Sequence, residues 1–165
     1  MGQVVSQAEL ILRRGGWKRN GQGVVCASGC FDLLHPGHIR LLEQARGLGD
    51  ILIVAVESDA SVQHSVVPAK LGAAEIARPI TPAAERMEIL AALAAVDCAV
   101  EFDGPSPHEF LLRLAPDVFV EGGTARDSIL RESESKTLGC RIVRFPLEPG
   151  YSTTRLIERI TELRA

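Results

Sequence analysis

Two histidines separated by a proline–glycine pair carry the most distinctive chemistry of the chain. His35 and His38 end the segment 28–38, SGCFDLLHPGH. An apolar run, 24–27, precedes this segment, and an amphipathic stretch, 39–46, follows it. Backbone N–H groups at a helix start favour anions, glycine allows close approach, and imidazoles add hydrogen bonds or charge. The pattern predicts a phosphate-binding turn between a first strand and a first helix.

The same two histidines also fit a structural role as capping residues, and the pair alone does not separate the two interpretations. Neither has a Glu or His partner at the spacing of a helical zinc pair, which argues against a metal site. Cys26 and Cys30 lack a second Cys/His pair at finger spacing. Buried thiols therefore explain these cysteines better than a structural zinc.

A second candidate anion site opens the last predicted helix. Ser152, Thr153 and Thr154 follow Gly150 and supply three hydroxyls beside the free N–H groups of a helix start. A plain N-cap would need only one of the three. A second helix N-terminus at the same edge of a sheet favours phosphate binding.

The elements that must position these residues follow from hydrophobic periodicity. Continuously apolar runs predict parallel strands, which are covered on both faces. Strands are expected at 24–27, 51–56, 97–102, 117–120 and 141–145. Helices are expected at 6–14, 39–46, 83–94, 107–114, 126–138 and 152–163. This alternation predicts an α/β fold in three layers, with a parallel sheet of about five strands and helices on both faces.

Ligands in such folds bind at the carboxyl ends of the strands. The turns at Gly29, Asp59, Gly122 and Gly150 all fall on that edge. The segment 61–77 is expected to be a long loop with at most a short helical turn. Thr81 is expected to cap the helix after it. The last helix is expected to turn four apolar residues inward: Leu156, Ile157, Ile160 and Leu163.

Length and composition indicate one domain spanning 1–165, in which 1–23 forms an N-terminal helix, stopped by Gly15 and Gly16, and a polar connector. The net charge of −3 gives no global basic field, so no nucleic-acid partner is expected. No secretory leader or membrane-spanning stretch is seen, so a cytoplasmic protein with reduced thiols and no membrane partner is expected.

The segment 29–38 resembles the HxGH signature of the cytidylyltransferase-like nucleotidyltransferases. Five later segments are similar in order and spacing to the ADP-heptose synthase adenylyltransferases, and the resemblance extends over almost the whole chain from Val24. These segments are 78–82, 85–87, 95–97, 116–117 and 150–154. The resemblance implies a Rossmann-like nucleotidyltransferase fold.

The resemblance also implies a reaction. A sugar 1-phosphate, expected to be D-glycero-D-manno-heptose 1-phosphate, attacks the α-phosphorus of a nucleoside triphosphate, expected to be ATP, and pyrophosphate leaves. Catalysis then consists of positioning and charge stabilisation. Mg²⁺ is expected to arrive on the triphosphate, without a direct protein ligand.

By this resemblance, each expected site residue has a role. The catalytic residues are His35 and His38. The other nucleotide-binding residues are Gly29, Cys30, Phe31, Arg86, Gly122, Ser152, Thr153 and Thr154. Asp32, Asp59 and Lys70 are candidates for binding the acceptor. Three alternatives stay open: Arg86 as a solvated helix residue, Asp59 as a turn cap, and Lys70 as too distant from Arg78 to match the family's loop lysine.

The chain departs from the family after the fourth strand. The heptose enzymes usually read Lys-Gly-Gly-Asp-Tyr, whereas this chain reads EGGTA at 121–125. Glu121 reverses a charge and Thr124 removes one, which indicates a different acceptor, compensation by Arg126 and Asp127, or reduced activity.

Two other functions are therefore retained. One is a cytidylyltransferase acting on glycerol 3-phosphate or a similar small phosphate. Leu147 and Glu148 argue against it, because they stand where those enzymes often have an arginine. The other is a non-catalytic nucleotide-binding relative, which Glu121 and Thr124 support. Related enzymes are often dimers, so a homodimer is retained beside a monomer, and the oligomeric state stays open.

Overall fold

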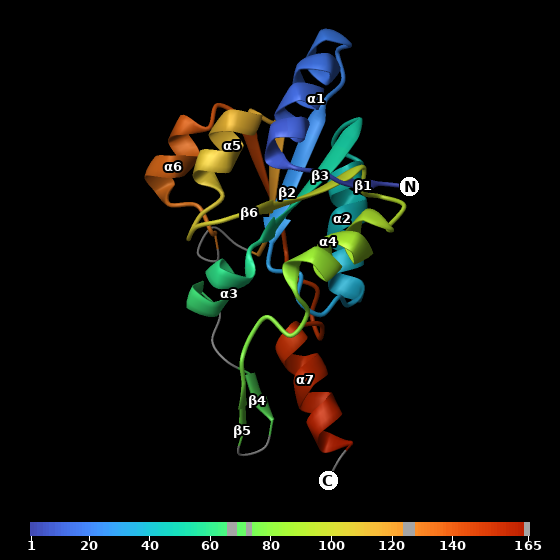
Figure 1. The fold of residues 1–165 in the computed structure, drawn as a ribbon, viewed down its shortest axis with the longest axis vertical. Coiled ribbons are helices and arrows are strands. Elements are labelled where there is room, and N and C mark those ends of the chain that lie inside the picture. Colours follow the sequence, from blue (N-terminus) through green and yellow to red (C-terminus); the bar gives the residue numbers. More distant parts are fainter. Residues whose placement is uncertain (66–68, 72–73, 124–127, 164–165) are drawn as a thin grey trace.

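Six parallel strands form the central sheet of the computed structural model, which describes residues 1–65, 69–71, 74–123 and 128–163 (Figure 1). Across the sheet the strands run in the order β1-β6-β3-β2-β7-β8. Their bounds are Gln3–Val4 for β1, Cys98–Phe102 for β6, Ile51–Glu57 for β3, Val24–Gly29 for β2, Val118–Gly122 for β7 and Arg141–Phe145 for β8. The prediction of a parallel sheet is confirmed.

The sheet has one strand more than the five expected. β1 pairs in parallel with β6, where Gln3 lies opposite Cys98 and Val4 opposite Ala99. A strand of two residues is too short to show an apolar periodicity, so sequence patterning does not detect it. This pairing ties the beginning of the chain to the edge of the sheet.

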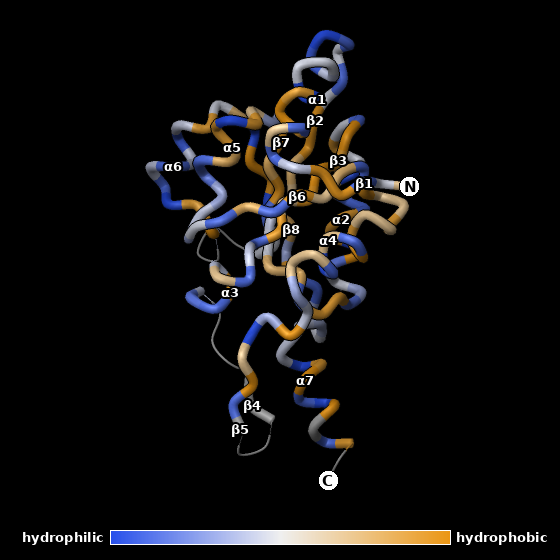
Figure 2. Tube along the Cα trace, in the orientation of Figure 1, coloured by the Kyte–Doolittle hydropathy of each residue, from blue (hydrophilic) through white to orange (hydrophobic). Residues whose placement is uncertain are grey.

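Helices cover both faces of the sheet, as expected for three layers (Figure 1). One face carries α1 (Gln7–Arg19), α5 (His108–Leu114) and α6 (Glu132–Thr137), and the other carries α2 (Pro36–Arg46) and α4 (Ala83–Ala91). Figure 2 shows the apolar residues concentrated along the strands between these layers.

Successive residues of each central strand enter opposite core layers. Cys26 packs in the same core layer as Leu10 and Phe110, whereas Val25 and Ala27 pack with the layer of α2 and α4. Both faces of the strand are therefore buried, which explains why the strand sequences are continuously apolar.

The first helix does not stop at Gly15 and Gly16, contrary to expectation, but runs to Arg19. Leu10 is fully buried and Trp17 packs against the same core layer. Arg14 Nη2 also donates to the carbonyl oxygen of Ala115 at 2.9 Å. These tertiary contacts on both sides of the glycines offset their low helix propensity, about 1 kcal/mol each.

The segment 61–77 contains the short helical turn that was allowed for in the expected loop, and in addition a hairpin that was not expected. The helix α3 spans Asp59–Ser65, and an antiparallel hairpin joins β4 (Ala69–Leu71) to β5 (Ala74–Ile76). The hairpin and the last helix, α7 (Thr153–Glu162), project together away from the central sheet (Figure 1). Short strands of mixed composition, with no clear alternation, explain why the hairpin escaped prediction.

Two helices near the end of the chain differ from their predictions. In α7, Ile157 is buried, but Ile160 is 50% exposed and the following Leu163 is 87% exposed, so these two do not turn inward. The reason is that α7 extends beyond the sheet that its apolar face was expected to cover. The predicted helix 126–138 is also shorter, because α6 begins only at Glu132.

No helix in the described part of the chain is both long enough and apolar enough to cross a membrane.

Candidate active site

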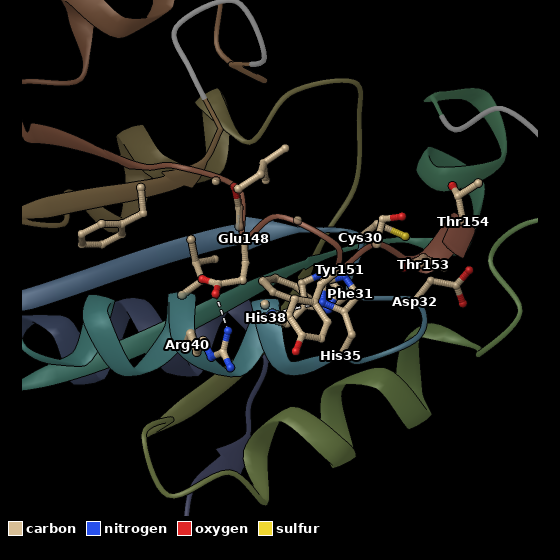
Figure 3. Close-up of a pocket in the computed structure, with 18 of the residues that line it drawn as sticks. Cys30, Phe31, Asp32, His35, His38, Arg40, Glu148, Tyr151, Thr153 and Thr154 are labelled. Carbon is tan, nitrogen blue, oxygen red and sulfur yellow. Dashed lines mark hydrogen bonds and ion pairs between the residues drawn. The ribbon is translucent and has the colours of Figure 1, made fainter. Parts of the chain in front are cut away.

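A cavity of about 430 Å³ lies at the carboxyl edge of the sheet, where the sequence placed the ligand site (Figure 3). The ends of β2, β3, β7 and β8 and the starts of α2 and α7 contribute to its wall. Nine of the predicted nucleotide-binding residues meet there: Gly29, Cys30, Phe31, His35, His38, Gly122, Ser152, Thr153 and Thr154.

The turn with the two histidines begins α2. His35 is the N-cap, and its Nδ1 accepts a hydrogen bond of 3.3 Å from the backbone N–H of His38. The two rings stack with their centroids 3.7 Å apart and an interplanar angle of 16°. A Cβ at Gly37 would lie 3.0 Å from His35 Nδ1, so glycine leaves room for the His35 ring to pack against this turn. His35 therefore combines the capping role with a position on the cavity wall.

Both histidines are neutral at pH 7 in this structure. Burial lowers the pKa of His38 to about 4, and His35 and Arg78 contribute to the same shift. Burial also lowers the pKa of His35. The Nδ1 atom of His38 is buried and has no hydrogen-bond partner among the described residues, which leaves a polar atom unsatisfied beside the cavity. The rings can hydrogen-bond to an oxyanion there.

The loop before the histidines is held in a strained conformation. Phe31 has a φ of 48°, in the left-handed region that a bulky residue rarely adopts, and its ring lies 5.2 Å from that of His38. Asp32 holds the loop from behind. Its carboxylate accepts hydrogen bonds from Arg78 Nε at 2.7 Å and from the backbone N–H groups of Ile80 and Thr81.

Asp32 thus lines the cavity but has both carboxylate oxygens occupied by protein donors. In this structure it fastens the loop to the segment before α4. Its predicted role in binding the acceptor has no free oxygen to support it.

The structure does not bring Arg86 to the cavity. Its side chain is 1% exposed and donates to Thr81 O at 2.8 Å, Cys30 O at 2.5 Å and Asp59 Oδ1 at 2.6 Å. The sequence did contain a signal of this. Arg86 follows Ala83 by three residues and precedes Leu90 by four, so it lies on the buried face of α4. Arg86 supports the Cys30 loop and is neither solvated nor part of the cavity wall.

Asp59 also lies outside the cavity wall. Asp59 Oδ1 accepts from the backbone N–H of Ala83 at 2.9 Å and so caps α4. Thr81 was expected to be this cap, but the N-cap position is Pro82, which has no side-chain oxygen to accept the bond. Lys70 pairs through the β4–β5 ladder with Glu75, and its side chain lies outside the part of the chain that the structure describes.

Among the last three predicted phosphate ligands, Ser152 is a helix cap. Its Oγ accepts from the backbone N–H of Arg155 at 3.1 Å. Thr153 Oγ1 lies 3.4 Å from the carbonyl oxygen of Leu33, whereas Thr154 is exposed at the cavity. One hydroxyl therefore caps α7, and the other two lie on the cavity wall at the helix start.

The reversed charge at Glu121 does not face the cavity. Glu121 is 3% exposed, and its Oε2 lies 3.0 Å from Nε of Arg144. Ser128 Oγ and the backbone N–H of Ile129 also donate to its carboxylate. The carboxylate is therefore compensated within the protein. Thr124, Arg126 and Asp127, which were considered with it, lie outside the described residues.

Sequence reasoning assigned no site role to several charged and aromatic residues of the cavity wall. These are Arg40, Glu57, Arg78, Glu148 and Tyr151. For Arg40 a signal was present, because it shares a helical face with Gly37, Leu41 and Gln44, which also line the cavity. For Arg78 and Glu148 no local pattern exists, because both lie in irregular segments.

The family model for cytidylyltransferase-like proteins matches residues 26–159. The chain belongs to the cytidylyltransferase-like family. This confirms the resemblance drawn from the HxGH segment. Two relatives named bifunctional protein HldE are similar to it, one from Koribacter versatilis (43% identical over 158 residues, 95% of this chain) and one from Streptomyces coelicolor (45% over 140 residues, 84% of this chain). The chain spans only 31% and 28% of these relatives.

Solved structures of this family's fold are also similar. A lipopolysaccharide core biosynthesis protein from Thermoplasma volcanium is 26% identical, with a TM-score of 0.61 over 78% of this chain and 98% of that one. A pantoate–beta-alanine ligase from Francisella tularensis, 15% identical, has a TM-score of 0.58 over 100% of this chain and 80% of the ligase. The second likeness concerns the fold alone.

Proposed function

We propose that this member of the cytidylyltransferase-like family transfers the AMP part of ATP to D-glycero-D-manno-heptose 1-phosphate and releases pyrophosphate. The observation that carries the proposal is that one cavity combines the His35–His38 turn with the start of α7. The names of the relatives, bifunctional protein HldE and a lipopolysaccharide core biosynthesis protein, support a sugar phosphate as acceptor.

The proposed reaction needs no covalent intermediate. A phosphate oxygen of the acceptor forms a bond to the α-phosphorus, and the bond from that phosphorus to the bridging oxygen of pyrophosphate breaks. Neutral His35 and His38 would hydrogen-bond to the phosphate oxygens on which charge develops. The hydroxyls and N–H groups at the start of α7 would bind the triphosphate from the other side. Catalysis then rests on orientation and hydrogen bonding.

Mg²⁺ belongs to the substrate in this proposal. The described residues contain no group of three or more His, Cys, Asp or Glu that could hold a metal ion. Of the carboxylates on the cavity wall, Asp32 accepts from protein donors, Glu148 is paired with Arg40, and burial raises the pKa of Glu57. A metal ion bound to the phosphate oxygens would therefore enter and leave with the nucleotide and pyrophosphate.

The remaining parts of the proposal concern the whole protein. We propose that residues 1–165 act as one nucleotidyltransferase domain in the cytoplasm, with the two small molecules as partners and without nucleic acid or membrane. The four free cysteines support a reducing compartment. We include a homodimer in the proposal because related enzymes often form one.

Two observations weigh against the alternatives. Glu148 lines the cavity where cytidylyltransferases acting on glycerol 3-phosphate often have an arginine, so this chain lacks the cation that those enzymes have at that position. The buried pair of Glu121 and Arg144 weakens the argument that Glu121 gave for a non-catalytic relative, because the reversed charge is compensated away from the cavity.

Pyrophosphate release tests the proposal. The protein is incubated with Mg²⁺ and each of the four nucleoside triphosphates, with heptose 1-phosphate or glycerol 3-phosphate as acceptor. We expect release with ATP and heptose 1-phosphate, dependent on the acceptor and lost in His38→Ala. The proposal would be falsified if no pair released pyrophosphate while the protein bound nucleotide.

A further inference from the structure

An ion pair between Arg40 of α2 and Glu148 of the turn before α7 lies on the cavity wall (Figure 3). The two residues are 108 positions apart in the chain, and their side chains are 47% and 37% exposed. The central carbon of the Arg40 guanidinium also lies 5.3 Å from the centre of the Tyr151 ring. Neither the sequence patterns nor the resemblance assigned a role to these three residues.

The pair continues the wall that the histidines form. The Tyr151 ring lies 6.3 Å from that of His35, which stacks on His38. Glu148 packs against the same turn, because its Cβ lies 3.3 Å from the position that a Cβ on Gly37 would take. Glu148 therefore lies beside the turn that is proposed to bind phosphate.

Among the described residues, no positively charged side chain on this wall is unpaired and free to bind a triphosphate. Arg78 is paired with buried Asp32, and Arg40 is paired with Glu148. The histidines are neutral. Of the two arginine pairs, only Arg40–Glu148 is substantially exposed. Exposed ion pairs contribute at most about 1 kcal/mol to the free energy of unfolding. A guanidinium binds phosphate through short, often bidentate hydrogen bonds that are stronger than this.

We propose that Arg40 is a triphosphate-binding residue of this site and that Glu148 is an internal anion which competes with the triphosphate for it. On binding, Arg40 exchanges the Glu148 carboxylate for phosphate oxygens. Glu148 therefore lowers the affinity for the polyanion by occupying its cation. This inference rests on the proposed function in that it takes the nucleotide to bind in this cavity.

Nucleotide binding measured by isothermal titration calorimetry tests the inference, with Mg-ATP and inorganic tripolyphosphate as probes. Arg40→Gln is expected to weaken binding of both probes about tenfold, as loss of one charge-assisted contact would. Glu148→Gln is expected to strengthen binding about threefold or more, because the competing exposed pair is gone. In the double variant, Glu148→Gln should have no further effect, since it acts through Arg40.

Two variants control for net charge. Glu43→Gln removes a carboxylate from the exposed side of α2, and Arg159→Gln removes a guanidinium from the exposed side of α7. Neither residue lines the cavity, and both variants should bind like the wild type. A gain of affinity in Glu148→Gln cannot come from misfolding, so the readout does not depend on equal stability.

The inference is overturned if Glu148→Gln binds no more tightly than Glu43→Gln, or if its gain persists in the Arg40→Gln background. Absence of any binding by the wild type to Mg-ATP and tripolyphosphate also overturns it. Binding with the expected pattern, but without pyrophosphate release from the triphosphate in the presence of any acceptor, would refute the proposed function and leave the role of Arg40 standing.

Discussion

The guanidinium of Arg86 donates a hydrogen bond of 2.5 Å to the carbonyl oxygen of Cys30, 56 residues earlier in the chain. Through this bond, the first turn of α4 holds the loop that leads to the histidine turn. The same side chain bonds Thr81 and Asp59, so one buried group joins three segments. The resemblance implied that Arg86 contacts the phosphates. In this structure its buried side chain instead holds the Cys30 loop in place.

Replacing Arg86 should therefore reduce stability first. Arg86→Met keeps much of the side-chain volume but leaves the carbonyl groups of Cys30 and Thr81 without a donor. Each lost buried hydrogen bond costs about 1–3 kcal/mol, so we expect a loss of roughly 2–4 kcal/mol in the free energy of unfolding. Urea denaturation at pH 7 measures it.

The exposed Arg159 offers the matched control, since Arg159→Met should change stability by less than about 0.5 kcal/mol. An Arg86→Met protein as stable as the wild type, but with selectively weakened nucleotide binding, would contradict the supporting role. It would favour the phosphate contact predicted from the resemblance.

The lowered pKa of His38 predicts a pH-dependent stability. The imidazole has an ordinary pKa of 6.5 when unfolded and one of about 4 when folded. Between these values the unfolded chain binds more protons, so stability is full above pH 6.5 and falls as the pH drops towards 4. The slope from this residue approaches 1.4 kcal/mol per pH unit.

Urea unfolding of wild type and His38→Asn at pH 7, 6 and 5 measures this contribution. The variant should lose less stability on acidification, and His35, whose pKa burial also lowers, should account for part of the remaining slope. Parallel curves for the two proteins would show that His38 is protonated alike in the folded and unfolded states.

Glu121 should be needed for stability in its charged form. Glu121→Lys, which restores the residue usual in the heptose enzymes, would place a buried ammonium beside Arg144, 3.0 Å from the former carboxylate. Because Arg144 is partly exposed, the cost should be less than the 3–5 kcal/mol of a fully buried broken pair, about 2 kcal/mol. Thermal and urea unfolding would detect it, and Glu121→Lys/Arg144→Glu should recover part of the loss.

Activity measurements on the same variant would show whether the side chain at position 121 faces the acceptor instead of Arg144. If Glu121→Lys were as stable as the wild type and pyrophosphate release increased with heptose 1-phosphate, the side chain at position 121 would have to face the acceptor. Glu121→Gln separates the two cases further, because it keeps the shape and removes only the charge that Arg144 compensates.

Much of the fold follows from local sequence. The apolar runs of β2 and β3 and the periodicity of α2 and α4 are properties of neighbouring residues, so pattern alone places them. The same holds for the histidine turn, because His35, Pro36, Gly37 and His38 interact within one helical turn. The rule that ligands bind at the carboxyl edge then brought this turn and Ser152–Thr154 to one place.

Tertiary structure alone decided which partner each of three arginines meets. Arg86, Arg78 and Arg40 are equivalent as residue types, but one is buried under the Cys30 loop, one holds Asp32 and one pairs with Glu148. The role of Glu121 likewise depends on its ion pair with Arg144 on the neighbouring strand. Each of these pairs joins positions distant in the chain. The role of a charged side chain depends on its partner and its burial in the folded protein. The spacing of residues in the sequence does not show which distant partner that will be.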